Sequence, residues 1–98
     1  MPIEWIGSEW ISEDDRNVVE ARLREIARDR DVQRLGIELR RERDGSYDVI
    51  VRGRLRGSRD QWIARRSRVG LWSTLHEALV AFETVVDRGV ASRTSLAA

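Results

Sequence analysis

The chain has 98 residues, of which 41% are hydrophobic and 36% are charged, with no cysteine, one histidine and a formal net charge of +1. A chain of this length buries about 65% of its extended surface, which is enough for one modest core. Its hydrophobic content is too high for an intrinsically disordered chain. The lack of cysteine and the single His76 exclude a disulfide framework and thiolate or histidine metal sites, so we expect no metal and no other cofactor.

The positive charges are all arginine and are concentrated in one part of the chain. Residues 1–48 carry 13 acids and nine arginines, residues 49–70 carry one acid and seven arginines, and residues 71–98 carry three acids and two arginines. The all-arginine composition reflects either a GC-rich genome or selection for bidentate recognition of phosphate or carboxylate groups. The net charge of +6 in the middle segment is typical of a surface for a polyanion, although a solvated strand face would also give part of it.

No targeting or membrane segment is recognisable. No stretch approaches the roughly 18 consecutive apolar residues of a membrane-spanning helix. The N-terminus reads Met-Pro-Ile-Glu and has neither a basic region nor an apolar one. We therefore expect a cytoplasmic protein with no membrane partner.

The first part of the chain predicts a strand followed by a helix. Residues 3–6 form the strand, which ends at Gly7. Ser12 begins the helix, and the three acids that follow it favour the positive end of the helix dipole. The helix is expected to end near Arg30, and it carries one apolar stripe at helical spacing. Its members are Val19, Leu23, Ile26 and Ala27.

Alternating apolar residues then predict two antiparallel strands joined by a short turn. A three-residue loop, residues 44–46, keeps the apolar side chains of both strands on one face and pairs Leu39 with Val51. A two-residue loop would instead place an arginine on the core face. In the favoured register Glu38 lies opposite Arg52 on the polar face.

A fourth strand and a second helix complete the pattern. Residues 62–69 carry arginine on both faces, which is typical of a strand at a sheet edge. The helix follows Gly70, with Thr74 and Glu77 spaced as a capping box, and Gly89 is placed to end it.

The resulting order is β-α-β-β-β-α. Each helix has one apolar stripe and the strands share one apolar face, which predicts a two-layer α+β fold with a four-stranded sheet and both helices on one face. Residues 1–89 are expected to form this single domain, and residues 90–98 a flexible tail.

Catalytic motifs are weak. Ser73, Thr74 and His76 are neighbours in a first helical turn, so their side chains point in different directions, and capping already explains the hydroxyls. The sequence has no glycine-rich phosphate loop, paired-carboxylate motif or metal-ligand spacing. We therefore expect a protein that is not an enzyme.

The third and fourth strands supply the strongest candidates for a binding site. The candidates are Arg52, Arg54, Arg56, Arg65, Arg66, Arg68 and Trp62. The first three alternate onto one face at about 6.5–7 Å, roughly the spacing of successive phosphates in a nucleic-acid strand. The other arginines add charge, and the indole offers a surface for base stacking. A polar sheet face with an arginine-guarded edge is the alternative interpretation.

Four tryptophans need partners or a function. Trp5 and Trp72 are predicted to pack in or against the core, because each buries a large area and needs only one partner for its indole N–H. Trp10 and Trp62 are the ones expected to be exposed, and an exposed tryptophan is a candidate contact residue.

Two segments resemble a known family. Trp5-Ile6-Gly7 leads through Trp10-Ile11-Ser12 into an acid-capped helix, and Gly70-Leu71-Trp72-Ser73-Thr74-Leu75-His76-Glu77-Ala78-Leu79 begins the last helix. Together with the β-α-β-β-β-α order, they make the sequence similar to the ribosome hibernation-promoting factor family, also called the sigma-54 modulation or ribosome-associated inhibitor family.

The resemblance implies a double-stranded-RNA-binding-like fold and a non-catalytic protein. Such a protein docks on the small ribosomal subunit, in the channel used by messenger and transfer RNA, and inhibits translation under stress. Family members carry basic residues on their helices, which adds Arg24 and Arg28 to the RNA-binding candidates here. The alternative is a protein-interaction or self-association module of the same fold, such as a homodimer, with no RNA role.

Overall fold

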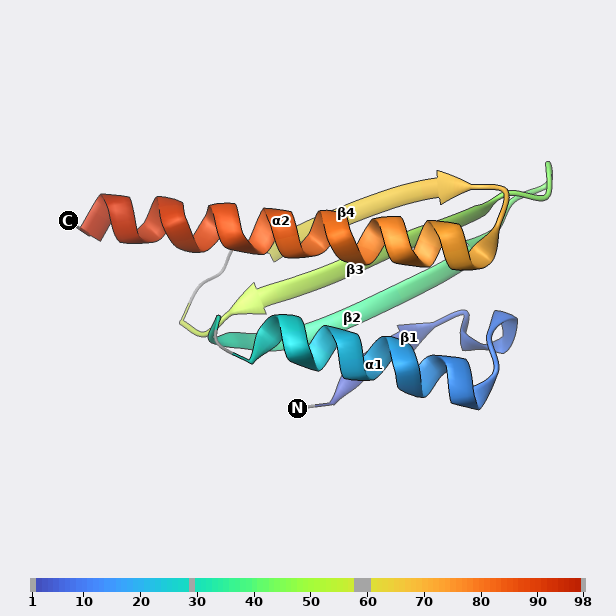
Figure 1. Ribbon diagram of the computed structural model, residues 1–98, viewed down its shortest axis with the longest axis horizontal. Helices are drawn as coiled ribbons and strands as arrows, with labels where there is room; N and C mark the ends of the chain where they lie inside the picture. The colour runs from blue at the N-terminus through green and yellow to red at the C-terminus, as the bar shows by residue number, and fades with distance from the viewer. Residues whose placement is uncertain (1, 29, 58–60, 98) are drawn as a thin grey trace.

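The computed structural model describes residues 2–28, 30–57 and 61–97, with side chains as far as residue 89. The elements in chain order are β1 (Ile3–Ile6), the 3-10 helix η1 (Ser8–Trp10), α1 (Glu13–Ala27), β2 (Val32–Arg41), β3 (Tyr47–Leu55), β4 (Gln61–Arg68) and α2 (Leu71–Ala97) (Figure 1). The predicted β-α-β-β-β-α order is confirmed.

The strands form one mixed sheet in the order β1-β2-β3-β4. β1 runs parallel to β2, and the other neighbours are antiparallel. Figure 1 shows α1 and α2 side by side in front of the sheet. The prediction of two layers with both helices on one face is therefore confirmed, and no helix of the described residues covers the second face of the sheet.

The core lies between the helices and the sheet. Ile37 of β2 pairs with Val51 of β3, and both are buried against Leu23 of α1 and Phe82 of α2. A Cβ atom at Gly53 would lie 2.6 Å from Cζ of Phe82, so the absence of a side chain at this position allows the ring to pack onto β3.

The sequence signals at the start of α1 act as predicted. The Ser12 hydroxyl accepts a hydrogen bond of 3.2 Å from the backbone N–H of Asp15. Three acidic residues occupy the first turn, where the helix dipole favours negative charge. The helix buries Val19, Leu23, Ile26 and Ala27, which are the predicted stripe.

The β2–β3 hairpin has the predicted loop length at a different position. The backbone N–H of Glu42 donates to the carbonyl of Ser46, so the loop consists of residues 43–45 instead of 44–46. Gly45 closes this loop with φ of 87°. A three-residue loop needs a left-handed last residue, a conformation that glycine adopts without strain and that Ser46 would have had to adopt in the predicted loop.

This shift of one loop position moves the strand register by two residues. Leu39 pairs with Val49 and not with Val51. Because the side-chain period of a strand is two, the apolar face is unchanged. The predicted pairing of Glu38 with Arg52 is wrong, since Glu38 lies opposite Ile50.

The predicted capping box of α2 is also wrong. The helix begins at Leu71, one turn earlier than a cap at Thr74 would place it. The Thr74 hydroxyl lies inside the first turn and donates a 2.6 Å hydrogen bond to the carbonyl of Gly70. Glu77 forms an ion pair with Arg68 and does not reach back to the helix start.

Gly89 does not end α2, which continues to Ala97. A Cβ atom at Gly89 would lie 2.5 Å from Cε2 of Trp62, so glycine at this position permits close packing between α2 and β4. Residues 90–97 therefore extend the helix, and residue 98 lies outside the described residues. The domain boundary at residue 89 and the flexibility of the last residues stay predictions.

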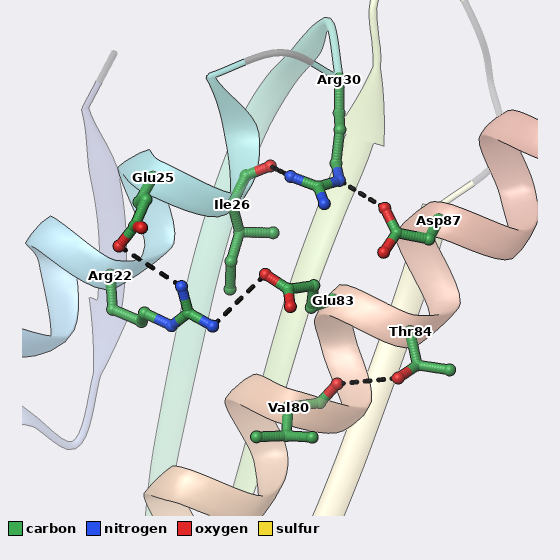
Figure 2. A network of polar contacts seen from close by, with 8 residues as sticks. All are labelled: Arg22, Glu25, Ile26, Arg30, Val80, Glu83, Thr84 and Asp87. Atoms are coloured by element: carbon green, nitrogen blue, oxygen red, sulfur yellow. Dashed lines mark hydrogen bonds and ion pairs between the residues drawn. The ribbon is translucent and has the colours of Figure 1, made fainter.

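Two arginines of the first half connect α1 and the turn after it to α2 (Figure 2). Nη2 of Arg22 lies 3.3 Å from Oε2 of Glu83. Nε of Arg30 donates to Oδ1 of Asp87 over 2.6 Å, and a second nitrogen of the same guanidinium donates to the carbonyl of Ile26. The helix layer therefore uses these arginines to hold its two helices together.

Candidate nucleic-acid interface

The nine candidate residues lie in three separate places. They are Arg52, Arg54 and Arg65 on the open face of the sheet, Arg24, Arg28 and Arg56 around a hollow at the end of α1, and Arg66, Arg68 and Trp62 on the helix side of β4. The strand alternation correctly placed Arg52 and Arg54 on one face, and Arg65 on the face opposite to Arg66 and Arg68. The prediction that Arg56 shares the face of Arg52 and Arg54 is wrong, because β3 ends at Leu55 and Arg56 lies in the turn after it, at the hollow by α1.

Arg65 is held by a carboxylate of the neighbouring strand. Its Nε and Nη2 atoms donate to the two oxygens of Asp48 over 2.9 and 2.7 Å, and the hydroxyl of Ser67 donates to the same carboxylate over 2.9 Å. The side chain of Asp48 is only 1% exposed. If an RNA phosphate bound the guanidinium of Arg65 instead, the buried carboxylate of Asp48 would lose its main hydrogen-bond partner.

The pKa of Asp48 reflects this arrangement. Burial raises the pKa, but the hydrogen bonds from Arg65 and Ser67 and the positive charges of Arg65 and Arg40 outweigh burial, so that the pKa lies below its ordinary value of 3.8. The hydrogen bonds to Asp48 and the negative charge of that carboxylate raise the pKa of Arg65. The pair is therefore charged throughout the neutral range and contributes to folding.

A second ion pair neutralises the same end of the open face. Nε of Arg40 lies against Oε2 of Glu38, which is largely buried. Arg40 also lies opposite Asp48 in the β2–β3 register. Two arginines and two acids thus balance one another at the end of the sheet nearest the β2–β3 loop.

The other end of the open face has no such balance. We call Arg34, Arg52 and Arg54 the open-face arginines, and none of them forms an ion pair with a carboxylate of the described residues. Arg34 lies directly opposite Arg54 in the β2–β3 register. Like charges in this position repel each other. The buried Nε of Arg54 has no hydrogen-bond partner within the described part of the chain, which costs about 1–3 kcal/mol.

Arg34 is the residue that sequence reasoning missed. It lies outside the basic segment of residues 49–70, and its neighbours along β2 are not basic. Only the cross-strand register brings it beside Arg54. The corrected hairpin loop would have revealed it, because that loop sets residue 34 opposite residue 54.

The open-face arginines and Gly36 line a hollow of about 140 Å³. Glu4 of β1 and Arg52 of β3 flank this glycine on the two sides of β2. A Cβ atom at Gly36 would meet nothing closer than the backbone oxygen of Glu4 at 3.7 Å. We call this feature the Gly36 hollow, and it exists because β2 has no side chain at its centre.

The hollow at the end of α1 has a volume of about 280 Å³ and contains three candidate arginines. Arg56 pairs with Asp31 over 3.1 Å, and Arg24 pairs with Glu20 over 3.1 Å. Arg28 has no ion-pair partner among the residues that the structure describes. One of the three guanidinium groups there is thus available without breaking an existing pair.

The arginines on the helix side of β4 also differ. Arg68 pairs with Glu77 over 2.9 Å. Arg66 donates to the carbonyl of its neighbour Arg65 over 2.7 Å and lines a groove of about 560 Å³ between β4 and α2. Arg88 lines the same groove. The edge strand β4 therefore carries charged side chains, as predicted.

The tryptophans follow the prediction in two cases of four. Trp5 is half-buried and donates its indole N–H to Glu20 over 3.2 Å, and Trp10 is 41% exposed. Trp62 is not exposed, because it packs against the core beneath α2. Trp72 is 48% exposed, because the helix begins at Leu71 and the residue after it faces away from the buried stripe.

The described part of the chain has neither a membrane-spanning helix nor a metal-binding cluster. None of its helices is both long enough and apolar enough to cross a bilayer. The same residues contain no group of three side chains suited to hold a metal ion.

The fold and its open, arginine-bearing sheet define a two-layer α+β protein with a known structural relative. A ribosomal subunit interface protein from Coxiella burnetii is similar, with a TM-score of 0.77 and 22% identity over 93% of this chain and 99% of that one. The N-terminal domain of Protein Y from Thermus thermophilus has a TM-score of 0.70 and 18% identity over 90% and 96% of the two chains. No protein-family model and no curated protein sequence matches the chain. The structures confirm the predicted resemblance at the level of the fold.

Proposed function

We propose that the chain is a non-catalytic, ribosome-associated factor of the hibernation-promoting type, which binds small-subunit RNA in the cytoplasm and blocks translation under stress. The fold supports this proposal, because its likeness to a ribosomal subunit interface protein extends over nearly the whole chain. Inhibition would be steric and would need no reactive group.

The observation that carries the proposal is the unpaired positive charge on the open face. The open-face arginines bring three guanidinium groups together without a neutralising carboxylate among the described residues. Arginines in this state can bind phosphate without first losing an ion pair. Arg52 and Arg54 are therefore the main proposed contacts, with Arg28 and Arg66 as secondary ones.

The other candidates have a smaller role in this proposal. Arg24, Arg56, Arg65 and Arg68 each pair with an acid of this chain. Exposed pairs such as these are weak and can rearrange, but the pair of Arg65 with buried Asp48 is costly to break. Trp62 is not proposed as a stacking surface, because α2 covers it.

Sedimentation with purified ribosomal subunits tests the proposal. We expect the chain in the small-subunit fraction at low salt and its release at high salt, because phosphate contacts weaken as salt rises. Absence from the small-subunit fraction at low salt, or association with the large subunit only, would contradict the proposal.

A protein-interaction or self-association module is the second candidate. The observation in its favour is the exposure of Val69 and Trp72, which lie three positions apart where β4 leads into α2 and are 81% and 48% exposed. Light scattering distinguishes the two functions. A mass that rises with protein concentration and does not respond to salt would favour a homodimer through this corner.

A further inference from the structure

The two ends of the open face differ in a way that indicates a ligand. At one end, Arg65 and Arg40 are matched by buried carboxylates. At the other end, the open-face arginines line the Gly36 hollow together with Glu4 and Glu38, and none of the three arginines forms an ion pair with a carboxylate of the described chain. A cluster of like charges with a buried, unsatisfied Nε of Arg54 is stabilised when an anion joins it.

The shape of the site favours a group that protrudes into it. A glycine inside a strand often marks a place where a ligand approaches the backbone closely. The Gly36 hollow has a volume of about 140 Å³. A cavity needs about 10–15 Å³ to hold one water molecule, so a hollow of this volume can admit a phosphoryl group. A phosphodiester that runs along a flat surface would not need a hollow.

The charge of the site favours a phosphate monoester over a diester. A monoester carries about −1.5 to −2 charges near neutral pH and offers three acceptor oxygens. Three guanidinium groups match these oxygens, and Arg34 and Arg54 on neighbouring strands can share them. A diester carries one charge and would leave part of the repulsion among the arginines in place.

Two acids line the hollow, of which Glu38 already pairs with Arg40. Glu4 of β1 lines the Gly36 hollow and forms no ion pair with the described residues. It is two strands away from Arg52, which corresponds to roughly 9.5 Å between backbones. A carboxylate at this distance would repel a second phosphate but can accept hydrogen bonds from sugar hydroxyls. The site therefore has an anion-binding side and a hydroxyl-binding side.

We propose that the Gly36 hollow binds a 5′-phosphorylated ribonucleotide, with the phosphate on Arg34, Arg52 and Arg54 and the ribose hydroxyls on Glu4. The nucleotide is either free or the 5′ end of an RNA, since both present the same phosphate monoester. This site goes beyond the proposed function, because it is complete in the isolated chain and needs no ribosome.

Equilibrium binding of AMP to the purified chain tests the proposal, with Gly36→Val as the main variant. A Cβ at this position meets only ordinary contacts, and valine is favoured in strands, so the variant is expected to unfold at the same temperature as the wild type. We expect the filled hollow to weaken AMP binding at least about tenfold. Equal AMP affinity in Gly36→Val and wild type, or no AMP binding by the wild type, would overturn the proposal.

Glu4→Ala separates the two sides of the site. We expect it to weaken AMP binding but not the binding of inorganic phosphate, because phosphate has no ribose. If Glu4→Ala strengthens both equally, the carboxylate only repels anions and its assignment to the ribose is wrong. Arg34→Gln should weaken both ligands.

Two RNA hexamers of one sequence, with and without a 5′ phosphate, show whether the bound phosphate belongs to a free nucleotide or to the 5′ end of an RNA. Tighter binding of the phosphorylated hexamer than of AMP supports an RNA end, and equal binding supports a free nucleotide. Equal binding of the two hexamers would overturn the proposal. Gly36→Val should still sediment with small subunits, since both Arg52 and Arg54 are retained on the open face and Arg52 is exposed. Loss of AMP binding with intact sedimentation, or the reverse, therefore separates failure of this site from failure of the proposed function.

Discussion

Arg65 of β4 donates two hydrogen bonds, of 2.9 and 2.7 Å, to the buried carboxylate of Asp48 on β3. The strand with the densest positive charge thus directs one of its arginines to the neighbouring strand. The consequence for function is that the number of arginines in a segment does not measure its capacity to bind an anion. The arginines that lack a partner determine that capacity, and on this sheet they lie around Gly36.

Asp48→Asn is expected to destabilise the fold by about 1–3 kcal/mol, because it removes a charge-assisted acceptor from a buried site. The loss depends on pH. Since the folded pKa of Asp48 is below its ordinary 3.8, the carboxylate stabilises the fold fully above that pH, and the contribution is lost as the pH falls through the folded pKa. Urea denaturation at several pH values measures both effects.

Glu83→Gln is the control for this prediction, because it also removes an ion pair to an arginine. The Arg22–Glu83 pair bridges two helices but is more than 30% exposed on both sides. We expect a cost below about 1 kcal/mol. An equal loss in both variants, or a loss in Asp48→Asn that persists unchanged far below pH 3.8, would contradict the assigned role of Asp48.

Gly89→Ala is expected to destabilise the protein, although the same change inside most helices is stabilising. Alanine favours a helix by about 1 kcal/mol over glycine. Here the new methyl would lie 2.5 Å from Cε2 of Trp62, and overpacking of this kind costs about 1–3 kcal/mol. Thermal unfolding followed by circular dichroism measures the sign.

Trp62→Val provides the matched background for Gly89→Ala. In this background the methyl has space, so the same substitution should become neutral or stabilising. If Gly89→Ala has the same effect with and without the indole, the close approach of α2 to β4 does not explain the glycine.

The salt dependence of RNA binding should identify which arginines contact phosphate. We expect Arg52→Gln combined with Arg54→Gln to lower the slope of log affinity against log salt by about 1.4 for single-stranded RNA, because two phosphate contacts are lost. Arg24→Gln, which loses an arginine paired with Glu20, should leave the slope nearly unchanged. Similar slopes for both variants would argue against the open face.

The sequence predicted the fold well because its signals are local. Period-two alternation, the cap at Ser12 and the apolar stripes each depend on residues close in the chain, and the structure confirms them. The two wrong helix signals involve Thr74 and Gly89. At both positions a tertiary or backbone contact explains a residue that local rules assign to a helix end.

The candidate site could be predicted only in part. The strand pattern correctly placed Arg52 and Arg54 on one face. It could not reveal that Arg65 is neutralised by Asp48, or that Arg34 lies beside Arg54, because both depend on register across strands. The register in turn depended on which loop position needs the left-handed conformation of Gly45.

Charge reversal on the open face tests the central claim most directly. The measurement is sedimentation of Arg52→Glu/Arg54→Glu with small ribosomal subunits, beside Arg16→Glu/Arg43→Glu, which changes the net charge equally at two arginines without ion pairs in the described structure. We predict that the first variant is lost from the small-subunit fraction and the second remains, with both unfolding near the wild-type temperature. Retention of the first variant, or equal loss of both, would contradict the account.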